Sequence, residues 1–503
     1  MNVPYYPVID LFAGPGGLGE GFASVKRGKR PSFKSLAAIE RDESAHRTLH
    51  LRHFVREFGD VLPSEYYDYL AGNLTREDLR QKFPSEWEAA EQSALKLSLG
   101  EANHDQVKSL ITKRLRGHKK WVLVGGPPCQ AYSLVGRSRR AHDPNFEQDE
   151  KHFLYREYLK IITDHQPPIF VMENVKGLLS AKVGGKPVID RILSDLSRPK
   201  AATTECGNGL SYRLFSLTER GEQIEGASPN SFIVRAEEHG VPQARHRMFI
   251  LGVRSDIAIE PDILKKQSSP SVQDVIDDLP PIRSGISKEP DSFKSWSDAI
   301  SEIWGAEWLS GAVDGKGISR FSKKAAAALP ASRSSNVCTQ PRAMSQWFGD
   351  KDLPIITCHE ARSHMRTDLQ RYFFASLFAM QTGVSPKLID FPEPLLPNHR
   401  NVEEGRAGKM FSDRFRVQVA DRVSTTVTSH ISKDGHYFIH YDPRQCRSLT
   451  VREAARLQTF PDNYHFEGPR TQQYHQVGNA VPPYLANQIG EVVADVLDRM
   501  EDF

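Results

Sequence analysis

The chain has 503 residues, of which 39% are hydrophobic and 26% charged, a composition that excludes a disordered or fibrous protein. The formal net charge of +3 is too small to indicate nucleic-acid binding by itself. No stretch approaches the roughly 20 apolar residues that a membrane helix needs, so we expect no membrane partner.

The cysteines predict a reducing compartment. There are five of them, an odd number, and no Cys-x-x-Cys pair occurs. They are Cys129, Cys206, Cys338, Cys358 and Cys446. A disulfide framework is therefore not expected. The N-terminus lacks a basic region followed by an apolar run, so it does not resemble a signal peptide, and we expect a cytoplasmic protein.

Four short apolar runs predict buried parallel strands, because each is followed by polar, glycine or proline residues. They are Val8–Phe12, Leu36–Glu40, Trp121–Val124 and Ile169–Met172. Helical stretches such as Tyr155–Asp164 lie between them. Alternating strands and helices predict an open α/β sheet whose ligands lie outside the carboxyl ends of the strands.

Two further runs, Phe232–Val234 and Met248–Leu251, are too close for a helical crossover and predict an antiparallel pair at the sheet edge. Thr450 and Glu453 form a capping-box pattern that should open a helix over Val451–Thr459. A closing amphipathic helix is predicted at about 484–500.

The remaining segments indicate the domain organisation. Residues 62–118 are charged and helical in composition, and predict an insertion between two strands. Residues 255–440 show little regular pattern. We expect a catalytic domain over 1–265, a second, less regular domain over 266–440, and a return to the catalytic domain over 441–503.

A glycine-rich turn follows the first predicted strand, from Gly14 to Gly19. Glycines there permit a tight turn and close approach of the backbone to a ligand, although an ordinary strand–helix turn explains them equally well. Glu40 ends the second strand, where a carboxylate can bind ribose hydroxyls. Asp60 follows at what should be the next strand end, where it can accept a bond from an adenine amino group. The pattern permits a dinucleotide or an adenosyl ligand, and no P-loop lysine follows.

Two side chains at later strand ends indicate chemistry. Cys129 follows Pro127 and Pro128 in a short loop, which favours a held nucleophile over a buried structural cysteine. Glu173 follows a strongly apolar strand, so its carboxylate needs a partner or a raised pKa; an ion pair or helix cap is the alternative.

Before the edge strand comes Gln243-Ala-Arg245-His-Arg247. Alternate side chains of a strand point to one face, so Gln243, Arg245 and Arg247 are expected to project together into the crevice. A solvated basic edge is the alternative interpretation.

Taken in order, these segments resemble the motifs of the DNA cytosine-5 methyltransferase family. The motifs are Phe-Ala-Gly-x-Gly-Gly at 12–17, Pro-Pro-Cys-Gln at 127–130, Glu-Asn-Val at 173–175, Gln-x-Arg-x-Arg at 243–247, Arg-Leu-Gln-Thr-Phe-Pro at 456–461 and Gln-Val-Gly-Asn-Ala-Val-Pro-Pro at 476–483. They leave the long middle of the chain unmatched. The resemblance implies a Rossmann-like α/β methyltransferase fold with a mixed sheet and a smaller, irregular target-recognition domain, using S-adenosylmethionine and no metal.

The resemblance also implies roles. Cys129 attacks C6 of cytosine, Glu173 contacts N3 and the exocyclic amine, and Arg245 and Arg247 hold O2. Phe12 stacks on adenine, Glu40 binds the ribose, Asp60 binds the amino group and Asn479 lies near the methionine end. All positions implied to bind the donor are Phe12, Gly14, Pro15, Gly16, Gly17, Leu18, Glu40, Arg41, Asp60, Val61, Pro128 and Asn479.

The implied partner is double-stranded DNA, from which the target base must be flipped out to reach the crevice. Positions implied to contact DNA are Gln130, Ser133, Gln243, Thr426 and Val427. Thr426-Val427 is our choice for the pair that supports the flipped base, and a strand of β-branched residues explains it equally well. By analogy we expect a monomer in the cytoplasm of a bacterial or phage-infected cell, functionally linked to a restriction endonuclease or another defence system.

Three alternatives stay open at this point. A tRNA cytosine-5 methyltransferase would share Cys129 and Glu173, but the compact Cys-Phe-Thr element of those enzymes is not found here. A non-catalytic DNA-binding relative would not need these residues intact. An NAD-type oxidoreductase would leave the Pro-Pro-Cys-Gln loop unexplained. The spacing of Cys358, His359 and His364 does not favour a metal site.

Overall fold

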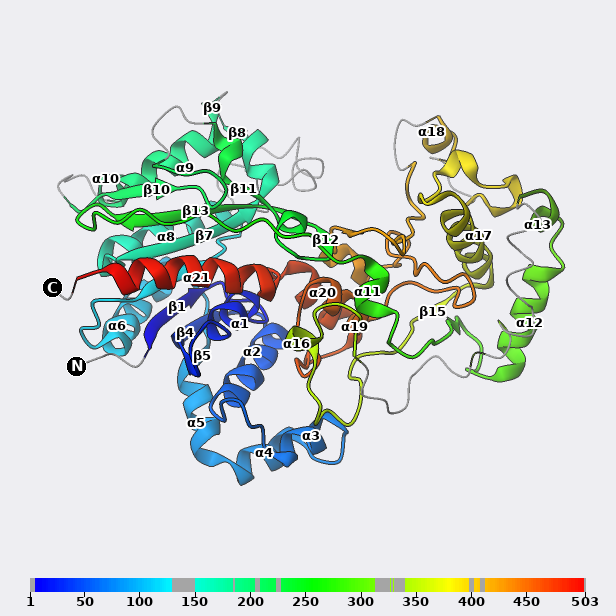
Figure 1. Ribbon diagram of the computed structural model, residues 1–503, viewed down its shortest axis with the longest axis horizontal. Coiled ribbons are helices and arrows are strands. Elements are labelled where there is room, and N and C mark those ends of the chain that lie inside the picture. The colour runs from blue at the N-terminus through cyan, green and yellow to red at the C-terminus, as the bar shows by residue number, and fades with distance from the viewer. Residues whose placement is uncertain are drawn as a thin grey trace.

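The computed structural model describes residues 5–128, 150–183, 186–203, 209–222, 228–312, 326, 329, 340–397, 402–407 and 412–501. Two lobes of unequal size make up the molecule, with helices α19 and α20 between them (Figure 1). Within the described residues, no helix combines the length and apolar character needed to cross a membrane.

The larger lobe is built on an eight-stranded mixed sheet of order β10-β13-β7-β6-β1-β4-β5, with β11 also paired to β13. Strands β7, β6, β1, β4 and β5 are parallel, whereas β13 runs antiparallel to β7, β10 and β11. The strands are β1 (Tyr6–Leu11), β4 (Phe33–Glu40), β5 (Ala94–Lys96), β6 (Val122–Gly125), β7 (Ile169–Val175), β10 (Tyr212–Phe215), β11 (Ile233–Arg235) and β13 (His246–Arg254).

The four predicted parallel strands are confirmed as β1, β4, β6 and β7, and the predicted antiparallel pair is confirmed as β11 and β13. Register explains how β13 reaches the site: Arg247 pairs with Val175 and Phe249 with Glu173. The start of β13 therefore lies beside the carboxyl end of β7. Residues 62–118 contain helices and also β5, a strand that we did not predict.

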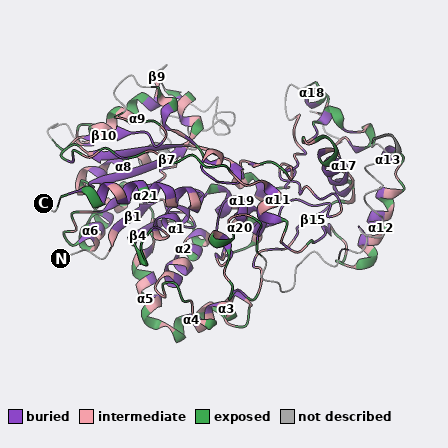
Figure 2. Ribbon diagram, in the orientation of Figure 1, coloured by how far each residue is buried: buried purple, intermediate pink, exposed green. Residues whose placement is uncertain are grey.

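Alternate strand residues pack on opposite faces of this sheet. Val122 and Val124 face a core formed with helices α1 and α21, whereas Leu123 faces a core formed with α6, α8 and α9. These helices are α1 (Gly17–Ala23), α6 (His104–Leu115), α8 (Glu150–His165), α9 (Val188–Ser197) and α21 (Pro483–Arg499). Figure 2 shows that the strands and α21 are mostly buried, which fixes the strand ends where the site forms.

The smaller lobe has a separate apolar core, centred on Trp296 of α12 and on Tyr372 and Phe373 of α17. Its elements are short apart from these two helices, which agrees with the weak sequence pattern. They are α12 (Phe293–Trp304), α13 (Glu307–Ala312), α17 (Arg366–Thr382), α18 (Val402–Arg406), β14 (Gly285–Ile286) and β15 (Ser363–His364). The boundaries at 266 and 441 stay predictions.

Between the lobes, α19 (Val451–Leu457) and α20 (Arg470–Asn479) share a core with α11 (Val272–Ile276). The predicted capping box is confirmed, because the Glu453 amide donates to the Thr450 hydroxyl (3.2 Å) and the Thr450 amide donates to the Glu453 carboxylate (2.7 Å). The helix ends two residues earlier than the predicted Thr459. The predicted closing helix is α21.

The other elements lie at the periphery or join the lobes. They are α2 (Glu43–Arg56), α3 (Ser64–Leu70), α4 (Arg76–Lys82), α5 (Pro84–Ser93), α10 (Pro199–Thr203), α16 (Ser345–Phe348), β2 (Lys26–Arg27), β3 (Arg30–Pro31), β8 (Lys182–Val183), β9 (Lys186–Pro187), β12 (Gln243–Ala244) and β16 (Ser424–Thr425).

Candidate active site

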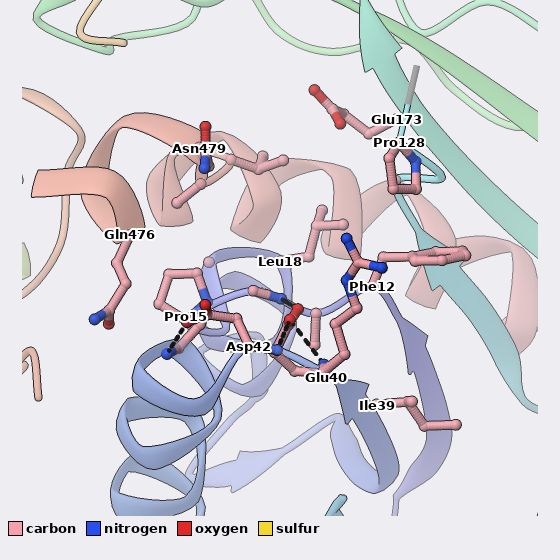
Figure 3. Close-up of a pocket in the computed structure, with 18 of the residues that line it drawn as sticks. Phe12, Pro15, Leu18, Ile39, Glu40, Asp42, Pro128, Glu173, Gln476 and Asn479 are labelled. Atoms are coloured by element: carbon pink, nitrogen blue, oxygen red, sulfur yellow. Dashed lines mark hydrogen bonds between the residues drawn. The ribbon is translucent and has the colours of Figure 1, made fainter. Parts of the chain in front are cut away.

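A cleft of about 590 Å³ opens at the carboxyl ends of β1, β4, β6 and β7. In Figure 3, Glu40 and Ile39 lie at one end, Glu173 and Pro128 at the other, and Gln476 and Asn479 along one side. The predicted residues that line the cleft are Phe12, Gly14, Pro15, Gly17, Leu18, Glu40, Arg41, Pro128, Glu173 and Asn479. Most of the predicted donor-binding set is thus brought together at the sheet edge where open α/β sheets bind ligands.

The turn after β1 requires its glycines. Gly14 and Gly16 have φ values of +57° and +97°, a region that disfavours residues with a Cβ. A Cβ on Gly17 would lie 2.3 Å from the Val481 carbonyl oxygen, so the turn touches the segment after α20 directly. Phe12 also adopts a positive φ, +59°, and its side chain lines the cleft. This strained backbone turns the ring toward the space that a ligand would occupy.

The Glu40 carboxylate organises the cofactor end of the cleft. It accepts hydrogen bonds from the backbone amides of Gly14 (2.8 Å), Arg41 (2.8 Å) and Asp42 (2.7 Å). Because a carboxylate has about four acceptor positions, roughly one remains for a hydroxyl group of a ligand. Glu40 therefore joins the glycine turn to the end of β4 and still faces the cleft.

An adenosyl group fits this end of the cleft by the chemistry of its walls. Ile39, Leu97 and Leu99 supply apolar surface for a base, and the free acceptor position of Glu40 suits a ribose hydroxyl. The glycine turn brings backbone close to the ligand without side-chain bulk. No lysine is among the described residues that line the cleft, and no phosphate-binding pattern follows the glycine turn, so the fit favours a nucleoside over a nucleotide.

The predicted roles of Asp60 and Val61 are not supported by their positions. The expectation that Asp60 ends a strand is wrong, because residues 57–60 form a turn after α2. Asp60 is exposed and pairs with Lys26 at 2.7 Å, and Val61 is 82% exposed. The strand next to β4 in the sheet is β5, which begins only at Ala94. Leu97, directly after β5, therefore lines the cleft where Asp60 was expected.

At the opposite end of the cleft, Glu173 and Arg247 form an ion pair, with Arg247 Nε 3.2 Å from Glu173 Oε1. Both side chains are largely buried, at 16% and 15% exposed. Burial raises the pKa of the Glu173 carboxyl, and the neighbouring Arg247 and Arg245 guanidiniums oppose that shift. We predicted that the Glu173 carboxylate needs a partner or a raised pKa, and the structure shows both, the ion pair with Arg247 and the raised pKa.

Gly126 makes room for Glu173. A Cβ at Gly126 would lie 2.7 Å from Glu173 Oε2, too close for the carboxyl group to stay in place. We expect Gly126→Ala to lower kcat of the reaction at this cleft by roughly 10- to 100-fold, because small displacements of catalytic groups are costly. Gly305→Ala is the control, since its nearest contact would be 3.4 Å away. Steady-state kinetics of both variants check this, and an unchanged kcat for Gly126→Ala would contradict it.

The loop after β6 leads to the predicted nucleophile. Asn174 on β7 donates from Nδ2 to the Pro127 carbonyl oxygen (3.1 Å), so the Glu-Asn-Val segment fixes the start of the Pro-Pro-Cys-Gln loop. Pro127 and Pro128 line the cleft next to Glu173. Cys129, Gln130 and Ser133 lie outside the described residues, and their predicted roles stay predictions.

The predicted projection of Gln243 and Arg245 into the crevice is wrong. Arg245 is buried and donates to the carbonyl oxygens of Val427 (2.8 Å), Ala480 (2.8 Å) and Gly478 (3.2 Å). Gln243 donates to the Leu457 carbonyl (3.1 Å), and neither side chain lines the cleft.

The physical reason for this difference is an interrupted strand. Gln243–Ala244 forms β12, which pairs with β16, whereas β13 begins at His246. Simple alternation therefore does not hold across Arg245, and Arg247 alone reaches Glu173. Gln243 and Arg245 instead tie the 424–427 segment to α19 and to the end of α20, where Asn479 lies.

The predicted base-supporting pair belongs to this junction. Thr426 donates from its hydroxyl to the Ala244 carbonyl (2.6 Å), and the Val427 amide donates to Gln243 Oε1 (2.8 Å). Val427 is fully buried, and neither residue lines the cleft. The alternative, a strand of β-branched residues, does not hold for Thr426 or Val427, because β16 comprises only Ser424–Thr425.

Asp10, which we did not single out, is the most unusual buried acid near the turn. It is 1% exposed, and neither carboxylate oxygen has a hydrogen-bond partner among the described residues. Burial raises its pKa to about 8, opposed by Arg56 and reinforced by Glu40. Asp10 is thus predominantly protonated at neutral pH, in contrast to Glu20, whose pairing with Arg52 and Arg56 outweighs burial and lowers its pKa to about 2.

This raised pKa predicts a pH-dependent stability. Because the folded pKa of Asp10 exceeds the unfolded value of about 3.9, its stabilising protonation is complete below pH 4 and is lost as pH rises toward 8. We expect the unfolding free energy of Asp10→Asn to fall less between pH 5 and 8 than that of the unmodified chain, by about 2–4 kcal/mol. Urea unfolding at both pH values measures this, with exposed Asp60→Asn as control. Equal pH dependence in Asp10→Asn and the unmodified chain would contradict it.

One wall of the cleft was missed by the sequence reasoning. Gln472, His475 and Gln476 line it from α20, on the same helical face as Asn479. Their spacing of three and four residues within the Gln-Val-Gly-Asn motif region was the available signal.

For the residues weighed as metal ligands, His359 contacts Thr450 and Pro280, and His364 contacts Ser448. No group of three or more metal-ligating side chains occurs in the part of the chain that the structure describes.

The chain is similar in sequence and fold to known methyltransferases. The family model for C-5 cytosine-specific DNA methylases matches residues 73–200 and 225–495. A type II methyltransferase of Bacillus paralicheniformis, M.Bpa9945I, is 33% identical and is aligned over 98% of this chain and 99% of its own. The type II methyltransferase M.DdeI of Desulfomicrobium norvegicum is 25% identical over 97% and 88%. Among solved structures, the Entamoeba histolytica methyltransferase EhMeth superposes with a TM-score of 0.45 at 12% identity, over 99% of each chain.

Proposed function

The chain belongs to the family of C-5 cytosine-specific DNA methylases, and on this premise we propose that its cleft holds S-adenosylmethionine beside a cytosine flipped out of DNA. The protein is a DNA cytosine-5 methyltransferase with a mixed α/β fold. The observation that supports our site assignment is the Glu173–Arg247 pair, of which Glu173 lines the cleft together with Pro128.

For the donor, we propose that Phe12 stacks on the adenine ring and that Glu40 accepts a bond from the ribose. The backbone of the glycine turn and Asn479 then flank the methionine end. The remaining contacts come from Pro15, Leu18, Arg41 and Pro128, with Gly14, Gly16 and Gly17 shaping the turn. S-adenosylmethionine supplies an electrophilic methyl group carried on a sulfonium sulfur. The Glu40 contacts with Gly14 and Asp42 hold the turn in place before the donor binds.

For the chemistry, we propose that the Cys129 thiolate attacks C6 of cytosine and forms a sulfur–carbon bond, which makes C5 nucleophilic. The protonated Glu173 carboxyl, favoured by its raised pKa, donates to N3 while negative charge builds on the ring. Arg247 holds O2 and orients Glu173. C5 then takes the methyl group, leaving the sulfonium donor as a neutral thioether. Loss of the C5 proton to water supplies the electron pair that breaks the sulfur–carbon bond, so the Cys129 thiolate leaves and N3 returns its proton to Glu173.

The smaller lobe is proposed to read the DNA sequence, since the cleft itself cannot reach a base inside a duplex. The loop that contains Thr426 and Val427 is joined to the cleft wall through Arg245, which contacts Val427 and Ala480. We propose that this loop supports the DNA beside the extruded base. Gln130 and Ser133, after the nucleophile, are proposed DNA contacts on sequence grounds alone.

The biological setting is also a proposal. Because relatives are named type II methyltransferases, we infer a functional link to a restriction endonuclease, in the cytoplasm of a bacterial or phage-infected cell. We further propose that the enzyme acts as a monomer.

The decisive test is transfer of a tritiated methyl group from S-adenosylmethionine to unmethylated duplex DNA, with tRNA as the competing substrate. We expect label in DNA only, and bisulfite sequencing should locate it at cytosines of one sequence. A duplex with 5-fluorocytosine at that site should trap a covalent complex, because that base has no C5 proton to lose. Label in tRNA alone, or no trapped complex from an active enzyme, would refute the assignment.

A further inference from the structure

A short turn beside α20 continues the wall of the cleft. It comprises the 3-10 helix η8 (Ser429–Ser432) and Lys433, which we call the η8 turn. Its backbone rests on α20, because a Cβ on Gly478 would lie 2.3 Å from the Ser429 amide nitrogen. Gly478 precedes Asn479, which lines the cleft. The η8 turn is therefore adjacent to the proposed site of methyl transfer.

The Arg362 side chain fixes the position of the η8 turn through two hydrogen bonds. Its guanidinium donates to the carbonyl oxygens of Ile431 (2.6 Å) and Lys433 (2.9 Å), and it lies over the Tyr474 ring of α20 at 4.4 Å from the centroid. Arg362 is only 8% exposed. Two fixed donors and a stacking face on one rigid group set the path of the turn relative to α20, which lysine's single ammonium cannot reproduce.

A second contact connects the turn to the cleft. Ser432 Oγ lies 3.1 Å from Nε2 of His475, and His475 itself lines the cleft from α20. The turn and the cleft wall thus form one continuous, fixed surface. By contrast, the His430 and Lys433 side chains are exposed, and no ion pair of the Lys433 ammonium is present among the described residues.

We propose that the η8 turn contacts the DNA backbone beside the target cytosine, with Lys433 binding a phosphate and Arg362 acting as the positioning residue. This proposal rests on the proposed function, because it assumes that the flipped base enters the adjacent cleft. A cation held at a fixed distance from the cleft edge suits a phosphate of the flanking backbone, and such contacts set register rather than read sequence. Ser429 and His430 are the other side chains of the η8 turn that can contact the DNA backbone.

The first test measures binding of a short fluorescein-labelled duplex of mixed sequence, by anisotropy at several salt concentrations. We expect Lys433→Ala to weaken DNA binding about 3- to 10-fold and to reduce the slope of log affinity against log salt by roughly 1. Lys113→Ala is the matched control, since Lys113 is exposed on α6 at the far side of the larger lobe (Figure 1). An equal affinity and slope for both variants would overturn the proposal.

The second test separates positioning from charge. Arg362→Lys keeps the positive charge at position 362 but loses one of the two carbonyl contacts, so Lys433 is no longer held near the phosphate. We expect DNA binding about 2- to 10-fold weaker, no weaker than for Lys433→Ala, with a similarly reduced salt slope. Affinity for S-adenosylmethionine should stay within twofold, and thermal unfolding verifies that the variant is folded. DNA binding equal to that of the unmodified chain would overturn the role of Arg362.

The two proposals fail in different ways. If the unmodified enzyme methylates DNA and is trapped on 5-fluorocytosine while Lys433→Ala binds normally, only the assignment of the η8 turn is wrong. If the unmodified enzyme neither binds nor methylates DNA, the proposed function fails first.

Discussion

Replacing Cys129 with serine is expected to abolish methyl transfer, with a loss of at least about 10⁴-fold in kcat, the scale on which removal of a covalent nucleophile acts. A serine hydroxyl is far less ionised than a thiol at neutral pH, so the bond to C6 cannot form at a useful rate. Radiolabel transfer to DNA measures the loss. Affinity for S-adenosylmethionine, measured by calorimetry, should remain within a few fold, because serine is close to cysteine in size and the donor-binding residues other than Pro128 belong to other segments.

Two outcomes would contradict this expectation. Appreciable transfer by Cys129→Ser would show that another group attacks the base. Loss of donor binding in the same variant would show that Cys129 supports the fold of the cleft rather than the reaction. Cys446→Ser serves as a control for cysteine replacement, because Cys446 is buried in the core of the smaller lobe and away from the cleft.

The second large effect is expected for Glu173→Gln, with a loss in kcat of about 10²- to 10³-fold. Glutamine keeps the shape of the side chain but can neither take up nor release a proton, and it offers Arg247, at 3.2 Å in the ion pair, no carboxylate. Glu77→Gln, on the exposed face of α4, is the control. A loss below threefold would show that Glu173 only fills space beside the cleft.

The pH profile gives this prediction a second measurement. Because burial raises the pKa of Glu173, its protonated form persists to higher pH than that of an ordinary glutamate. The rate should fall as pH rises through the folded pKa of Glu173. Rising pH should also favour the Cys129 thiolate, which attacks the base, and this effect raises the rate. We therefore expect a bell-shaped profile for the unmodified enzyme and loss of the alkaline limb in Glu173→Gln.

Elements of the sheet were predictable where the buried strand is mostly apolar. The runs that became β1, β6 and β7 are apolar on both faces and end in glycine, proline or polar residues, so their type and their ligand-binding ends follow from burial alone. Strands β5 (Ala94–Lys96) and β10 (Tyr212–Phe215) were missed because three or four residues with mixed character carry little periodicity. The error at Asp60 has the same origin, since β5 was the strand that should have been sought.

Side chains of the site were predictable when their backbone is part of the sheet, as for Glu40 and Glu173. Gln243 and Arg245 were misplaced because their partners, Val427, Leu457 and Ala480, are distant in sequence and meet only where the lobes join. Periodicity cannot reveal that a strand is interrupted, as it is between β12 and β13. A polar motif at such a junction can either join segments by hydrogen bonds or contact a substrate, and the sequence pattern does not distinguish these two roles.

The order in which the walls of the cleft are made has a consequence for synthesis. The turn at Gly14–Gly17 is translated early, but it is closed by Val481 and by helix α21, which packs against α1. A nascent chain therefore carries the first half of the pocket long before its counterpart leaves the ribosome. Unfinished polypeptides should consequently be unable to retain the sulfonium compound, so that modification of the genome waits for complete translation.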